Sequence, residues 1–186
     1  MIIRIPVKPF ICKYLQRQFG QELTLSDHNY ISMLFIGLLR KFEKGNPVVQ
    51  RPNSKIIDGV AFVGYNVFIG DGLYNKYGAY ISNDHIKFLN EALDNMICRQ
   101  MFDWIYSPAS PHKEVDYNII AFRDMYGIEE DELPFDNLKR WFYRERIRMM
   151  KRNGYAIPDR ENQLVIDFKY DPEKVVVPSN QVLIGF

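Results

Sequence analysis

Four cations recur at helical spacing near the end of the chain. Arg140, Arg144, Arg148 and Lys151 follow one another at intervals of four, four and three residues. On a helix they share one face about 80° wide, with no acidic residue among them. Guanidinium groups bind phosphate oxygens and guanine edges bidentately, so the row predicts a DNA-binding surface. The alternative is a solvated amphipathic helix with surplus arginines.

Three further cations belong to the same candidate site. Lys139 directly precedes the row, and Lys13 and Arg17 lie four residues apart on an earlier predicted helix. We expect Lys13 and Arg17, together with Lys8, to contact the DNA backbone, which positions a protein on the duplex without specifying sequence.

The position of each cation along the helix suggests its role. The N-terminal half of a recognition helix usually contacts base edges. We therefore expect Arg140 and Arg144 to affect binding in a sequence-dependent way. Arg148 and Lys151 lie further along and are expected to contact phosphates.

The same helix carries an apolar stripe through which it can pack. Leu138, Phe142 and Met149 lie within about 40° of one another, with Trp141 at the margin. We expect Trp141 and Phe142 to be at least partly buried against a long helix over 82–106. Glu145 falls within this stripe and needs a cationic partner, since an unpaired buried carboxylate is costly.

No enzyme motif accompanies these cations. The glycines between 64 and 72 match neither phosphate-loop pattern. The three histidines and two cysteines lack metal-ligand spacing, and we interpret the cysteines as buried reduced thiols. They are His28, His85, His112, Cys12 and Cys98. We expect no catalytic residue, metal or cofactor, although an enzyme with a dispersed site stays open.

An acidic run precedes the basic helix. Glu129 to Glu132 are consecutive carboxylates without the alternating spacing of a calcium loop. We interpret the run as a solvated loop. Its place before the basic helix suggests that it repels the DNA backbone locally or pairs with Lys139 and Arg140.

Composition and length favour one folded domain. The chain has 186 residues, of which 47% are hydrophobic and 15% aromatic, too rich for a disordered chain. The net charge of +1 hides a segregation of charge along the sequence. Residues 56–135 carry 5 basic and 13 acidic side chains, whereas 136–152 carry 7 basic and 2 acidic. The N-terminal pattern and the lengths of the apolar runs lead us to expect neither a signal peptide nor a membrane span.

The periodicity predicts the elements that hold these residues. We expect an α+β fold, predominantly helical, with a small antiparallel sheet and a C-terminal helix-turn-helix-like unit followed by a β-rich tail. The connection from Gly127 to Phe135 is longer than is usual in a helix-turn-helix. The predicted parts are 1–81 (α/β), 82–154 (helical) and 155–186 (β-rich tail), in one globular unit. The predicted strands are 2–7, 60–69 and 73–81, and the predicted helices are 10–19, 30–42, 82–106, 115–126 and 136–153.

Two segments carry a resemblance to known proteins. FRDMYGI at 122–128 and LPFDNLKRWFYRER at 133–146 resemble the C-terminal helical part of small uncharacterised proteins of phages and mobile elements in gut Bacteroidetes. The similarity covers about a third of the chain and transfers no active-site residue. It implies a mobile-element origin and a role in DNA handling or in the virion.

Two functions follow as expectations. The first is a homo-oligomeric protein that binds double-stranded DNA as a transcription regulator or an architectural or DNA-handling factor, in the cytoplasm of a bacterial host cell. The second is a phage structural or adaptor subunit that binds neighbouring chains, with aromatic rings and added strands making the contacts. In that case the protein is expected in the virion.

Overall fold

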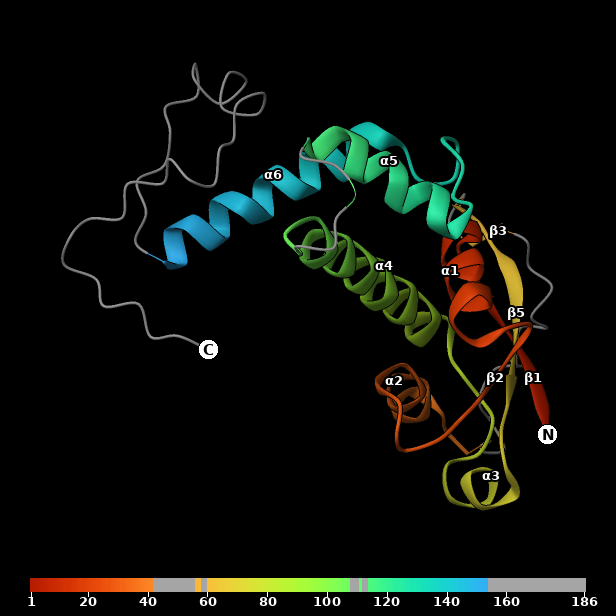
Figure 1. Cartoon of the computed structure of the whole chain (residues 1–186). Coiled ribbons are helices and arrows are strands. Elements are labelled where there is room, and N and C mark those ends of the chain that lie inside the picture. The colour runs from red at the N-terminus through yellow and green to blue at the C-terminus, as the bar shows by residue number, and fades with distance from the viewer. Residues whose placement is uncertain (42–55, 58–59, 108–110, 112–113, 154–186) are drawn as a thin grey trace. The chain divides into compact units, whose positions relative to one another are not determined.

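A computed structural model describes residues 1–41, 56–57, 60–107, 111 and 114–153 (Figure 1). The chain is α+β and mainly helical, as the sequence predicted. Its elements are β1 (Ile2–Val7), α1 (Pro9–Phe19), β2 (Glu22–Thr24), α2 (Tyr30–Leu38), β3 (Ile56–Ile57), β4 (Val60–Ala61), β5 (Val63–Phe68), α3 (Asp71–Tyr77), α4 (Asn83–Ile105), α5 (Val115–Tyr126) and α6 (Phe135–Arg152). The chain divides into two units, Met1–Tyr143 and Arg144–Phe186, with the boundary inside α6. The predicted tail strands after 154 lie outside the described residues.

The main sheet has three strands in the order β1-β5-β2. β1 pairs antiparallel with β5, from Ile2 opposite Phe68 to Val7 opposite Val63. β2 pairs with β5 in the parallel direction, so the sheet is mixed and the predicted antiparallel pairing holds for β1 and β5 only. Parallel neighbours need a long connection that returns the chain to the same end of the sheet, and residues 25–62 provide it. β3 and β4 form a separate antiparallel pair.

The free edge of β1 is partly blocked. Met1 and Ile69 exchange two backbone hydrogen bonds of 2.9 and 2.8 Å, so by the alternation of an antiparallel ladder the even-numbered residues of β1 face the outer edge. One of these is Pro6, which has no N–H to offer another strand. Its carbonyl oxygen accepts a hydrogen bond from Asn90 of α4 at 3.1 Å. This end of the edge is therefore unsuited to strand addition.

Most helix boundaries lie where capping residues predicted them. Pro9 opens α1, and Gly20 ends it with φ of 81°. Ser82 caps α4 by accepting a hydrogen bond from the N–H of His85 at 3.2 Å. Gly127 ends α5 in the left-handed conformation, with φ of 63°.

Two predicted elements were wrong. The strand expected over 73–81 is instead α3, which begins after Gly70 and ends before Gly78. Its aromatic residues gave a strand-like composition, but flanking glycines and a short polar run favour one short helix. A side chain at Gly78 would meet the carbonyl oxygen of Arg40 at 2.3 Å, so this close approach requires glycine.

The second error concerns α2, which was expected to run to residue 42. It ends at Leu38, because Leu39 has an extended backbone. Arg40 instead exchanges two backbone hydrogen bonds with Tyr80, of 2.9 and 3.1 Å. The helix begins after Asn29, whose side chain accepts from the N–H groups of Ile31 and Ser32.

α4 is the central helix of the first unit and contacts α1, α2, α5 and β1. One stripe along it is fully buried: Leu89, Leu93, Ile97 and Met101 each have an exposed fraction of 0%. Their spacing of four residues is the helical period that the sequence showed. Cys12 and Cys98 are buried free thiols, as expected.

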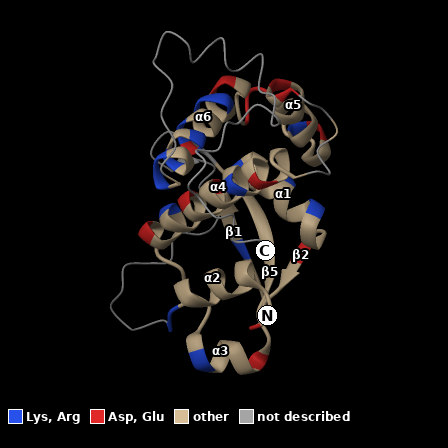
Figure 2. Cartoon of the chain, turned by 60° about the vertical axis from the view of Figure 1, so that its left-hand side comes forward, with Lys and Arg blue, Asp and Glu red and all other residues tan. Residues whose placement is uncertain are grey.

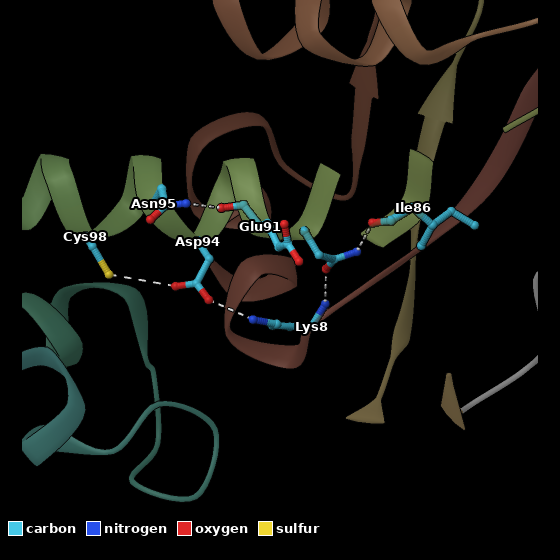
Figure 3. Close-up of polar contacts among 7 residues, drawn as sticks. Lys8, Ile86, Glu91, Asp94, Asn95 and Cys98 are labelled. Carbon is cyan, nitrogen blue, oxygen red and sulfur yellow. Dashed lines mark hydrogen bonds and ion pairs between the residues drawn. The ribbon is translucent and has the colours of Figure 1, made fainter. Parts of the chain in front are cut away.

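A buried amide ties α4 to the connection between β1 and α1. Asn90 has an exposed fraction of 2%. Its Oδ1 accepts from the N–H of Lys8 at 2.8 Å, and its Nδ2 donates to the carbonyls of Pro6 and Ile86 at 3.1 and 2.9 Å. Lys8 Nζ also reaches Asp94 Oδ2 at 2.7 Å, one turn further along α4 (Figure 3). The amide has no unsatisfied polar group, so its burial stabilises a single arrangement.

A tyrosine network joins α1, α4 and α5. The Tyr14 hydroxyl donates to Gln100 Oε1, and Gln100 Nε2 donates to the Tyr126 hydroxyl at 3.2 Å. Gln18 Nε2 reaches the same hydroxyl at 3.1 Å, and the Tyr14 and Tyr126 rings lie 4.9 Å apart. The three helices are thus fixed by both rings and hydrogen bonds.

We predict alkaline destabilisation from two buried tyrosines. Burial raises the pKa of Tyr14 from 10.0 to about 12, with Tyr126 nearby adding to the effect, and burial likewise raises the pKa of Tyr65 to about 12. The folded chain keeps these protons while the unfolded chain loses them. Stability is therefore complete below pH 10 and falls as the pH rises from 10 to 12, on the order of 2 kcal/mol for each tyrosine.

Urea unfolding at a series of pH values checks this expectation. Tyr14→Phe and Tyr65→Phe should each make the loss of stability above pH 10 shallower, because phenylalanine does not ionise. Tyr74→Phe, at an exposed tyrosine of α3, controls for loss of a hydroxyl. A pH dependence identical in wild type and both buried-site variants would show that these hydroxyls do not control it.

Candidate nucleic-acid interface

An aromatic cluster anchors the first half of α6 to the end of α4. Phe142 and Leu138 have exposed fractions of 1%. The Phe142 ring lies 5.2 Å from that of Phe102 and stacks on Tyr106 at 5.8 Å with an angle of 14°. Trp141, half-buried, meets Phe102 edge-on at 6.3 Å. The expected burial of Trp141 and Phe142 against the 82–106 helix is confirmed.

The acidic run is a loop in which Glu129, Glu130 and Asp131 are exposed, as expected, and its carboxylates also make specific contacts with their surroundings. Glu130 Oε1 accepts the backbone N–H of Phe135 at 2.9 Å, at the start of α6. Its other oxygen pairs with Arg123 Nη1 at 2.5 Å. A carboxylate at a helix N-terminus satisfies an orphan N–H and complements the helix dipole.

Lys13 holds the rest of the run. Its Nζ lies 2.8 Å from Glu132 Oε2 and 3.1 Å from Glu129 Oε1. Glu132 Oε2 also accepts the N–H of Glu129 at 3.0 Å. The hydrogen bond to Glu132, with that to Glu129, raises the pKa of Lys13. The expected partners of the acidic run included Lys139, but Lys13 and Arg123 take that role.

Lys139 connects α6 to α5. Its Nζ lies 2.7 Å from Asp116 Oδ2 and 5.6 Å from the centre of the Phe135 ring. Asp116 lies at the start of α5, and Arg123, near its end, pairs with Glu130 before α6. The start of α5 thus pairs with a residue within α6, and the end of α5 pairs with a residue before α6. The first turns of α6 therefore run antiparallel to α5. A helix-turn-helix arrangement of α5 and α6 is not confirmed.

The predicted cation row lies exposed on α6. Arg140, Arg144, Arg148 and Lys151 are all exposed. From position 140 to 152 every exposed side chain is Arg or Lys, including Arg152, which sequence reasoning did not include. Figure 2 shows several basic residues along α6, with an acidic residue among them, and residues of both charges on α5. Arg152 could have been found from the helical period, since it lies at the edge of the same face.

One carboxylate accompanies the row in the second half of α6. Glu145, whose side chain is 13% exposed, pairs with Arg148 at 3.2 Å. Arg148 lies on the same helix, three residues on. Arg148 stays 69% exposed, so this pair is weak and solvent-screened.

The seven predicted site residues fall into two groups. Lys13 and Lys139 bind carboxylates within the fold. The other five are exposed, four of them on α6 and Arg17 on α1. In the described part of the chain, no three His, Cys, Asp or Glu side chains gather to hold a metal ion. None of the described helices combines the length and hydropathy that a membrane span requires.

We predict that Phe142 is a main anchor of α6. Phe142→Ala should lower the free energy of unfolding by about 3 kcal/mol, since it removes a fully buried ring from the aromatic cluster. Tyr117→Ala, at a ring that is 55% exposed, should cost far less. Equal losses of unfolding free energy in Phe142→Ala and Tyr117→Ala, measured by urea unfolding, would contradict the assignment of the Phe142 face of α6 as its packing face.

A second prediction separates a structural cation from an exposed one on the same helix. Lys13→Met should cost about 1 kcal/mol, because it leaves the Glu132 carboxylate, 15% exposed, without its cation. Arg17→Met, four residues on, should change stability by less than about 0.5 kcal/mol. Chemical unfolding at low and high salt gives both values. A larger loss of unfolding free energy in Arg17→Met than in Lys13→Met would contradict the assignment of Lys13 as a structural cation and Arg17 as an exposed one.

No known protein family, curated protein or solved structure significantly matches the chain. Function must therefore be argued from the chemistry of the site itself.

Proposed function

We propose that this chain binds double-stranded DNA through the exposed row of α6, as a transcription regulator or an architectural or DNA-handling factor of a phage or mobile element. One observation carries the proposal: the exposed residues of α6 from 140 to 152 are cations alone. Arginine side chains on a helix are suited to phosphate oxygens and base edges.

Local charge supports this function more than net charge does. The chain as a whole carries +1, yet the last helix concentrates 7 basic side chains against 2 acidic ones between 136 and 152. A DNA duplex presents about one negative charge per 1.7 Å of its axis, and binding cations release condensed counterions. A concentrated basic helix gains from this release regardless of the protein's overall charge.

The remaining predicted cations have different roles in this proposal. Lys139 and Lys13 hold the start of α6 and the loop before it, through Asp116 and Glu132. They are positioning residues, and the exposed cations of α6 would make the DNA contacts. Arg17, exposed on α1, would add a backbone contact.

The proposal predicts a measurable effect of individual arginines. Arg144→Ala and Arg148→Ala should each weaken binding of a short labelled duplex and reduce the slope of log K against log salt by about one, as loss of a phosphate contact does. Fluorescence anisotropy between about 50 and 200 mM salt gives the slope. Lys76→Ala, at an exposed lysine of α3, is the matched control. Absence of duplex binding by the wild type at low salt, where attraction is strongest, would refute the function.

A second candidate is the phage structural or adaptor subunit. It is favoured by exposed apolar side chains on α5, where Tyr117, Ile120 and Met125 are 55%, 42% and 41% exposed. Apolar side chains gathered on one exposed face are typical of protein-binding surfaces. Under the DNA-binding function the same face would serve the expected homo-oligomer. A large assembly in solution that does not bind DNA would favour the adaptor function.

A further inference from the structure

We propose, building on the DNA-binding function above, that α6 binds the phosphate backbone and makes no sequence-specific contacts with base edges. The affinity would then be equal for all duplex sequences. The sequence alone favoured base contacts by Arg140 and Arg144, because recognition helices present their N-terminal half to the groove. Three features of α6 oppose such docking.

The first feature is the charge at the N-terminal end of α6. Exposed carboxylates cluster there: Glu129 is 74% and Glu130 65% exposed, and Asp131 and Asp136 are exposed as well. Inserting this end into a groove would bring carboxylates between two rows of phosphates. Like charges at such distances repel, most strongly at low salt.

The second feature is that, apart from arginine and lysine, which can also bind guanine, the exposed face carries none of the side chains that read adenine or thymine. Adenine is read by Asn or Gln, and thymine by a small apolar contact. No exposed position of α6 from 140 to 152 carries such a residue. The exposed amide that does occur, Asn137, lies within the acidic end beside Asp136.

The third feature is the geometry of the row. At about 1.5 Å per residue, the distance along α6 from Arg140 to Lys151 is about 16 Å, with one cation at roughly every turn. Phosphates recur about every 3.4 Å of axis on each strand, so each cation can find a phosphate oxygen. Arg152 adds a cation at the end of the row, so the basic charge is densest furthest from the acidic end.

Competition among duplexes tests this inference. Wild-type protein is titrated with AT-rich, GC-rich and randomised DNA duplexes of one length, and the randomised pool is selected for tight binders. We expect affinities within about threefold of one another and no enriched sequence. Arg144→Ala and Arg148→Ala should reduce the salt slope equally on every duplex. Asn137→Ala, at the one exposed amide of the acidic end, should change no affinity.

Several outcomes would overturn the inference. An enriched sequence bound more than about tenfold tighter, or a tenfold loss confined to one sequence in Asn137→Ala or Arg144→Ala, would show base reading. Those results would leave the DNA-binding function intact. Failure of the wild type to bind any duplex at low salt would instead refute the function itself. An RNA duplex bound more than about tenfold tighter than DNA would overturn the choice of DNA. Thermal melting confirms that each variant is folded.

Discussion

The fold depends most on the buried amide of Asn90. It joins the middle of α4 to the connection between β1 and α1 through three hydrogen bonds. Both Pro6 and Lys8 present backbone groups at this connection, and no regular ladder satisfies them. A buried group left without a partner costs about 1–3 kcal/mol. Asn90 thereby sets the position of α4 on the sheet, and α4 in turn contacts α1, α2 and α5.

The far end of α4 then determines how α6 begins. Phe102 on α4 and Tyr106 directly after it pack against Phe142, while Glu130 and Lys139 fix the first turn of α6. Packing assigns one face of α6 to the core and leaves the face of Arg140 exposed. Lys13 and Lys139 are held by Glu132 and Asp116, whereas Arg140 lies on the exposed face of α6.

Sequence periodicity predicted the features that depend on local interactions. It gave the helices α1, α4, α5 and α6, their glycine ends, and the buried side of Phe142. It missed β2, because three residues carry no periodic signal, and its parallel direction, which depends on distant pairing. The role of Lys13 could not be foreseen either, since its partner Glu132 is 119 residues away. On α6 the exposed cations were found because they follow the helical period of their own element.

Hydrogen–deuterium exchange with and without a DNA duplex tests the central claim most directly. The amides of α6 from 140 to 152 should exchange more slowly in the presence of duplex, because bound phosphates suppress local opening of this helix. The backbone amides of α5 should exchange at the same rate with and without duplex. Protection of α5 alone, or no change anywhere in α6 under conditions of saturating duplex, would contradict the account.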